Sequence, residues 1–189
     1  MIPYTALLDA NVLYPAPIRD LLLQLAVSDV FRAKWTADIH DEWTRSLLRN
    51  EPHRDPARIA RTRAMMDEST RDCLVEGYHA LIPSLSLPDP DDRHVLAAAI
   101  VGKCDCIMTQ NLKDFPAETL RPFGIESQHP DEFLLNQMTL APGVFLSSVR
   151  KIRLRLVKSK LSPHEYLANL TRVGLVATAS ELSSYADVI

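Results

Sequence analysis

Strand-length segments alternate with stretches of helical periodicity along the chain as far as residue 130. The segments that predict strands lie at residues 5–8, 30–35, 104–109 and 125–128, and extended chain is also expected at 73–76 and 80–87. Apolar residues recur at helical spacing between them, over residues 17–28, 36–49, 56–69, 92–101 and 116–123. This alternation predicts an α/β domain with a parallel sheet and right-handed crossovers.

The pattern changes near Pro130, after which only helical spacing is found. Ser162 and Glu165 form a capping-box pattern, with Pro163 at the first helical position. The predicted helices cover residues 131–140, 142–158, 163–172 and 175–186. We therefore predict an α/β domain over residues 1–135 and an all-helical C-terminal extension over residues 136–189.

Composition narrows the class of protein only moderately. The 189 residues carry a net charge of -3, so any affinity for nucleic acid must come from local patches. Cys104 and Cys106 are one residue apart, which is neither a C-x-x-C nor a zinc spacing, and the three cysteines are expected to be reduced core thiols. No apolar run approaches the ~18 residues of a membrane span. We expect a soluble, cytoplasmic protein.

Acidic and amide side chains stand at the ends of successive predicted elements. Asp9 ends the first strand, Glu42 lies on the next helix, and Asn111 and Asp114 follow the strand at 104–109. A cluster of acids, Asp89, Asp91 and Asp92, opens the helix at 92–101. Helix capping and dipole complementation explain acids at such positions. An oxygen-only ligand set suits Mg²⁺ or Mn²⁺.

The chain resembles the PIN-domain ribonucleases, in the branch of VapC-type toxins from toxin–antitoxin pairs. The resemblance spans roughly residues 4–128, and the helical tail resembles that of a longer VapC-type subgroup. It implies a three-layer PIN-like α/β fold around a central parallel sheet, followed by the helical extension. Four segments in series carry it: Leu8-Asp9-Ala10-Asn11, Thr36-Ala37-Asp38-Ile39-His40-Asp41-Glu42-Trp43, Pro90-Asp91-Asp92-Arg93-His94-Val95-Leu96-Ala97-Ala98-Ala99 and Ile107-Met108-Thr109-Gln110-Asn111-Leu112-Lys113-Asp114-Phe115-Pro116.

The resemblance implies that Asp9, Glu42 and Asp92 bind metal and act in catalysis. Asp89 and Asp91 remain alternatives to Asp92. The fourth acidic position of the family is occupied by Asn111, and Asp114, one turn on, is the candidate replacement as a metal ligand. Supporting positions around these ligands are expected at Asn11, Thr109 and Asn111.

The implied activity is that of a Mg²⁺- or Mn²⁺-dependent endoribonuclease, the toxin of a type II pair. Its products would carry a 5′-phosphate and a 3′-hydroxyl. The implied partners are an RNA substrate, a cognate antitoxin protein and a second copy in a homodimer, with no membrane. Basic side chains for RNA are Arg45 and Arg49, and the run Arg150, Lys151, Arg153, Arg155, Lys158 and Lys160.

Two other functions fit the same residues. One is a non-catalytic PIN-fold module that binds RNA or protein and has a degraded fourth acidic position. The other is a metal-dependent phosphatase or DNA nuclease on a related sheet. The six histidines are scattered, and we expect them at surface or capping positions, with His94 turned away from Asp92.

Overall fold

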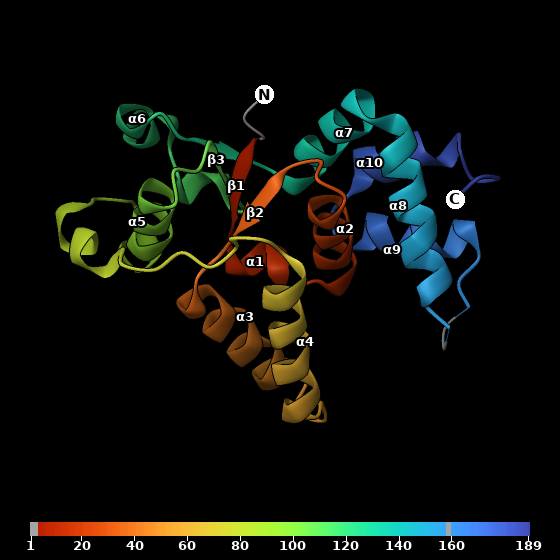
Figure 1. The fold of residues 1–189 in the computed structure, drawn as a ribbon, viewed down its shortest axis with the longest axis horizontal. Coiled ribbons are helices and arrows are strands. Elements are labelled where there is room, and N and C mark those ends of the chain that lie inside the picture. The colour runs from red at the N-terminus through yellow and green to blue at the C-terminus, as the bar shows by residue number, and fades with distance from the viewer. Residues whose placement is uncertain (1–3, 158–159) are drawn as a thin grey trace. The chain divides into compact units, whose positions relative to one another are not determined.

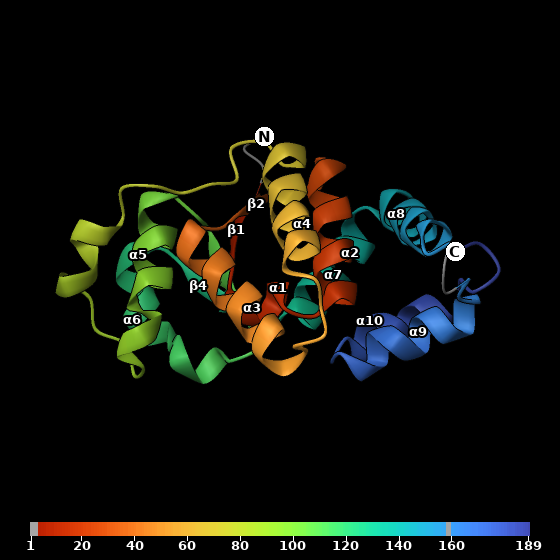
Figure 2. The same cartoon turned by 90° about the horizontal axis from the view of Figure 1, so that it is seen from below.

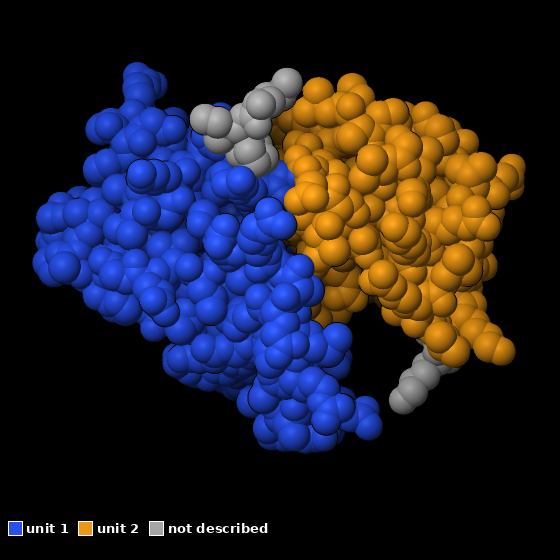
Figure 3. All heavy atoms as spheres, in the orientation of Figure 1, with its two compact units in different colours: residues 1–14, 31–129 blue, residues 15–30, 130–189 orange. Residues whose placement is uncertain are grey.

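The computed structural model describes residues 4–157 and 160–189 (Figure 1). The chain forms two compact units (Figure 3). Unit 1 comprises the described residues up to Tyr14 together with Phe31–His129, and unit 2 comprises Pro15–Val30 and Pro130–Ile189. These units differ from the predicted division after residue 135, because the chain leaves unit 1 at His129 and an early segment joins unit 2.

A four-stranded parallel sheet forms the centre of unit 1, as predicted. The strand order is β2-β1-β3-β4, with β1 at Thr5–Leu8, β2 at Arg32–Lys34, β3 at Cys106–Met108 and β4 at Glu126–Gln128. Every residue of β1 and β3 is buried, which explains their continuously apolar sequences. Leu8 pairs with Met108 in the register, so the residues that follow β1 and β3 emerge side by side.

The helices of unit 1 begin where the sequence provides caps. The Thr36 hydroxyl accepts from the Ile39 N–H at 3.0 Å and starts α3, Ala37–Asn50. The Asp55 carboxylate similarly starts α4, Pro56–Ser69, which packs against α3 in both ribbon views (Figure 1, Figure 2). The Ala-rich helix α5, Arg93–Val101, contacts β1 and β3. The short elements are α1, Ala10–Leu13; α6, Ala117–Leu120; and the 3₁₀ turns η1, His79–Ser84; η2, Pro90–Asp92; η3, Leu112–Asp114; and η4, Arg121–Phe123.

The expectation of extended chain over residues 80–87 was wrong for residues 80–84. Residues 79–84 form η1, and Pro83, which has no N–H to donate to a neighbouring strand, lies inside it. The earlier segment does pair: Trp35 N–H donates to Cys73 O at 2.8 Å, and Val75 N–H donates to Trp35 O at 2.9 Å. The outer side of β2 therefore gains a short parallel bridge rather than a second long strand.

Unit 2 is built from helices alone among its described residues. It contains α2, Ala16–Val27; α7, Pro130–Leu140; α8, Pro142–Arg155; α9, Pro163–Arg172; and α10, Val176–Ser183. Within the unit, α2 contacts α8 and α9, and α10 contacts α7 and α9. The predicted capping box of Ser162 and Glu165 is present. None of the described helices is long and apolar enough to cross a membrane.

Candidate active site

Asp9 is fixed at the carboxyl end of the central strand. Its backbone N–H donates to Met108 O at 3.0 Å, and its side chain is buried, with 5% of the residue exposed. The carboxylate accepts from the Ala10 N–H at 2.6 Å, from Asn11 Nδ2 at 2.6 Å and from Thr109 Oγ1 at 2.8 Å. Burial raises the pKa of Asp9, the hydrogen bonds from Thr109 and Ala10 oppose this, and the charge of Glu42 raises it further.

Thr109 connects the loops that follow β1 and β3. Its Oγ1 accepts from Asn11 Nδ2 at 2.9 Å and from the Asn111 N–H at 3.1 Å, besides donating to Asp9. Asn11 Oδ1 accepts from the Gln110 N–H at 3.0 Å. The contacts expected of Asn11 and Thr109 around Asp9 are therefore present, and one buried hydroxyl sets the orientation of the acid.

Of the three acids before α5, Asp92 is the one that faces the site. Asp89 is exposed and caps the turn, accepting from the Asp91 N–H at 2.9 Å, and Asp91 is also exposed. Asp92 is half-buried and makes no capping hydrogen bond with its side chain. Burial and the charges of Asp9, Asp89 and Asp114 together raise the pKa of Asp92 to about 7. These observations favour Asp92 over its neighbours.

Asn111 and Asp114, which follow β3, form a hydrogen-bonded pair near the other acids. Asn111 Nδ2 donates to Asp114 Oδ2 across the turn η3. Since the charge of Asp114 acts on Asp92, the carboxylate that follows Asn111 lies within electrostatic reach of the other acids. The amide of Asn111 therefore holds the Asp114 carboxylate close to the fourth acidic position, which Asn111 occupies.

Glu42 projects from α3 and contacts His94 of α5. His94 Nε2 lies 2.8 Å from Glu42 Oε1, with the two side chains 12% and 40% exposed. The expectation of a surface or capping position was wrong for His94, because its side chain is largely covered and contacts Glu42 of α3. Burial lowers the pKa of His94. The hydrogen bond and charge of Glu42, together with the smaller effects of the Asp38 and Asp9 charges, outweigh burial and raise that pKa overall.

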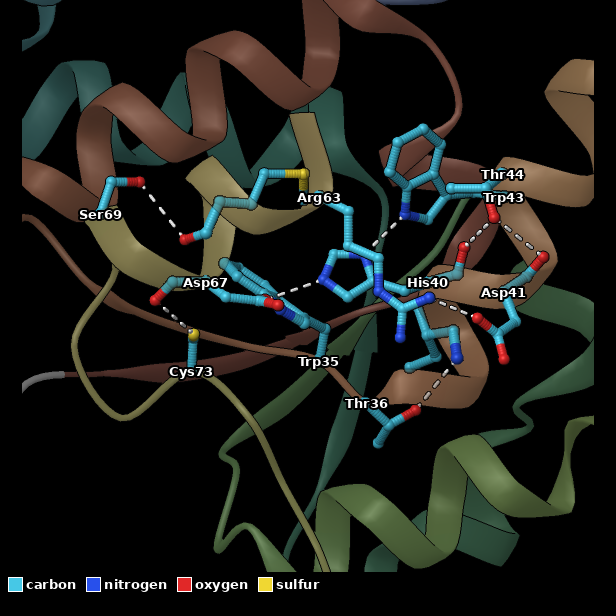
Figure 4. Close-up of polar contacts among 12 residues, drawn as sticks. Trp35, Thr36, His40, Asp41, Trp43, Thr44, Arg63, Asp67, Ser69 and Cys73 are labelled. Atoms are coloured by element: carbon cyan, nitrogen blue, oxygen red, sulfur yellow. Dashed lines mark hydrogen bonds and ion pairs between the residues drawn. The ribbon is translucent and has the colours of Figure 1, made fainter. Parts of the chain in front are cut away.

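The opposite side of α3 is anchored by a buried polar network (Figure 4). His40 Nε2 lies 2.9 Å from Asp67 Oδ1 of α4, and the Trp43 indole N–H donates to His40 Nδ1 at 2.9 Å. The Trp35 indole N–H donates to the same Asp67 oxygen at 2.8 Å. Because Nδ1 accepts, Nε2 carries the proton, and burial lowers the pKa of His40. The expected surface position was therefore wrong for His40, which is fully buried.

The predicted basic residues divide between the two units. Arg45 and Arg49 are exposed on α3, and Arg150, Lys151 and Arg155 are exposed on α8. Lys160, which lies beyond the end of α8, is also exposed. Lys158 lies outside the described residues. Arg153 differs from them, since its guanidinium donates to Leu161 O at 3.0 Å and to Ile189 O at 2.9 Å. It ties the end of unit 2 together instead of facing outward.

The donor set suits a hard cation in its chemistry. Within residues 4–157 and 160–189, no group of three or more His, Cys, Asp or Glu side chains is placed so that it could hold a metal ion. Asp9 and Asp92 nevertheless both offer carboxylate oxygens, and the charge of Asp9 raises the pKa of Asp92. A divalent cation would offset this repulsion, so the residues fit such a group by the chemistry of their oxygen donors, although their side chains are not gathered into a ready-made site.

Comparison with known proteins gives matches in both units. A family model described as PIN domain matches residues 5–113, and one described as VapC50 C-terminal domain matches residues 130–184. The second match begins at Pro130, which is also where the C-terminal segment of unit 2 begins. A protein of Mycobacterium tuberculosis H37Rv named "Putative ribonuclease VapC50" is 47% identical over 64 residues, or 34% of this chain and 37% of that protein. No solved structure matches the chain.

Proposed function

The chain belongs to the PIN-domain family, and from this premise we propose that it is a divalent-cation-dependent endoribonuclease of the VapC type. The fragment shared with the mycobacterial protein, whose name describes it as a ribonuclease, supports this activity. The matched stretch spans only about a third of that relative's length, 37%.

The observation that carries the proposal is the electrostatic coupling of Asp9 with both Asp92 and Glu42. Asp9 follows β1, Asp92 ends η2 and Glu42 lies on α3, and the charge of Glu42 acts on Asp9 as that of Asp9 acts on Asp92. Helix capping accounts for one hydrogen bond of Asp9, from the Ala10 N–H at the start of α1, but it does not account for Asp92, whose side chain makes no capping bond. Gathering like charges costs free energy, which a bound cation offsets.

Asp9, Glu42 and Asp92 would hold the cation, with Asp114 as a further oxygen donor beside Asn111. When bound, the cation supplies positive charge for the scissile phosphate and lowers the pKa of an attacking water. Thr109 and Asn11 hold the Asp9 carboxylate in one orientation. Glu42 is 40% exposed, so it is accessible to orient a water.

The substrate proposal rests on exposed arginines. Arg45 and Arg49 lie one and two turns beyond Glu42 on α3 and are exposed to solvent. Their spacing suits contacts with successive phosphates, and Arg150, Lys151 and Arg155 of unit 2 offer a second basic run. Because only 6% of residues are aromatic, recognition of a structured RNA by its backbone and shape fits better than stacking on a single strand.

The regulatory setting follows from the family. VapC-type proteins act as toxins, so we propose a cognate antitoxin that blocks the acidic site and a homodimer as the working form. The expected products carry a 5′-phosphate and a 3′-hydroxyl. The extra helices of unit 2 are candidates for RNA or antitoxin contact.

Cleavage assays with Asp9→Asn test this proposal. The purified chain is incubated with structured RNA, duplex DNA or a small phosphate ester, in MnCl₂ or in EDTA. Of the three substrates, we expect only RNA to be cleaved, and only in MnCl₂. The folded Asp9→Asn variant should not cleave it. Undiminished RNA cleavage by that variant would contradict the proposal, and RNA binding without turnover would identify a non-catalytic module.

A further inference from the structure

The contact between Glu42 and His94 is not explained by packing alone. The two residues lie on different helices, α3 and α5, and Nε2 of His94 is 2.8 Å from Oε1 of Glu42. The second ring nitrogen, Nδ1, is buried and has no hydrogen-bond partner among the described residues. Glu42 is thus the polar partner of this imidazole, and the contact accounts for a histidine at this largely covered position.

Both ends of the contact are rigidly held. α3 is anchored on its other side by the hydrogen bond from Trp43 to His40 and by the contact of His40 with Asp67 (Figure 4). α5 follows directly from Asp92 and has five consecutive buried residues, 95–99, against the sheet. The distance between Glu42 and His94 is therefore set by packed helices rather than by flexible loops.

The contact also decides which oxygen of Glu42 is available. A carboxylate has two oxygens, and the imidazole N–H occupies Oε1. Among the described residues no other hydrogen bond or ion pair to Glu42 is formed, so Oε2 is left for a further ligand. The contact also restricts rotation of the carboxylate, which lowers the entropy lost when that ligand binds.

We propose that His94 is a positioning residue of the metal centre, which holds Oε1 of Glu42 so that Oε2 is presented to the cation bound with Asp9 and Asp92. This inference rests on the proposed metal dependence and adds a role for a residue outside the acidic set. A histidine that orients a ligating carboxylate belongs to the outer shell of a metal site, where substitutions commonly weaken metal affinity by about 10- to 100-fold.

Mn²⁺ binding to the full chain tests the proposal without relying on catalysis. The electron paramagnetic resonance signal of free Mn²⁺ gives the dissociation constant for the wild type, His94→Ala and His94→Gln. We expect His94→Ala to weaken binding by about 10- to 100-fold. His94→Gln should stay within about threefold of the wild type, because its amide N–H can replace Nε2 as donor to Glu42.

Two further variants separate positioning from general stabilisation. In a Glu42→Gln background, His94→Ala should change the Mn²⁺ affinity no further, because the carboxylate that His94 holds has already been replaced by an amide. His79→Ala is the matched control: His79 contacts Asp38 at 3.1 Å, one turn before Glu42 on the same helix, and its loss should leave Mn²⁺ binding unchanged.

The outcomes distinguish this inference from the function on which it rests. Wild-type affinity in His94→Ala, or an equal loss in the Glu42→Gln background, overturns the role of His94 and leaves the proposed nuclease intact. A wild type that does not bind Mn²⁺ overturns both. If His94→Ala does not fold, His94→Asn replaces it, because the shorter amide cannot reach Glu42 as Gln does.

Discussion

Replacing Asp92 with Asn should raise the stability of the metal-free protein while abolishing catalysis. Burial, followed by the charges of Asp9, Asp89 and Asp114, moves the pKa of Asp92 from 3.8 to about 7. Keeping this carboxyl ionised at pH 8 without a cation therefore costs folding free energy. Asparagine keeps the shape of the side chain and removes the charge.

The size of the effect follows from the two pKa values. From 3.8 to about 7 is a span of about three pH units, each worth about 1.36 kcal/mol, which gives an upper value of about 4 kcal/mol. Asp92 is only half-buried, and because solvent screens such a group we expect about 2 kcal/mol. Because the pKa of this carboxyl is raised in the folded state, the contribution of Asp92 to stability is fully present below pH 3.8 and is lost as the pH rises through about 7.

Urea unfolding in EDTA at pH 8 and at pH 4 measures this gain. Both tryptophans of the chain, Trp35 and Trp43, lie in unit 1, so their fluorescence follows the unit that contains the site. Asp91→Asn is the control, because it removes a negative charge at the same helix start from an exposed side chain. The gain of Asp92→Asn over this control should disappear at pH 4, and added MnCl₂ should stabilise the wild type but not Asp92→Asn.

A different result would refute the reasoning. If Asp92→Asn is less stable than Asp91→Asn in EDTA at pH 8, Asp92 stabilises the start of α5 and carries no electrostatic cost. The raised pKa would then have no consequence for folding. The assignment of Asp92 to the metal site would lose its main physical support.

Two other predictions concern the surroundings of the site. Thr109→Val removes a buried hydroxyl that serves Asp9, Asn11 and Asn111, so urea unfolding should show a loss of about 1–3 kcal/mol and cleavage should fall with it. In His40→Gln the disadvantage relative to the wild type should shrink as the pH falls below 6.5, because burial lowers the pKa of His40 and the unfolded chain binds the proton first. A disadvantage that stays constant from pH 8 to pH 5 would count against the neutral His40.

The strand ends were predictable because they depend on local order in the sequence. Asp9 follows a short apolar run, and Thr109 follows the next buried one, so parallel pairing had to bring them to one edge. The choice of Asp92 also agrees with its half-buried position. Its metal-binding role stays a prediction, as do those of Glu42 and Asp114.

The roles of the histidines were not predictable from single helices. Helical spacing gives the direction of His94 and His40 on their own helices, but not which helix faces them, and that decides whether Glu42 or Asp67 becomes the partner. For the same reason, the sequence pattern did not show that α2 packs with the C-terminal helices. In the sequence Arg153 could not be distinguished from its exposed basic neighbours, because the carbonyl groups that it contacts, those of Leu161 and Ile189, are brought to it only by the fold.

The central claim is that the acidic edge of the sheet cleaves RNA with the help of a divalent cation. Its most direct test is to sequence the 5′ ends of cellular RNA after expression of the chain, ligating only ends that carry a 5′-phosphate. We predict new 5′-phosphate ends at a small set of RNA sites, absent when Asp9→Asn is expressed at the same level. The same ends in both samples would contradict the claim.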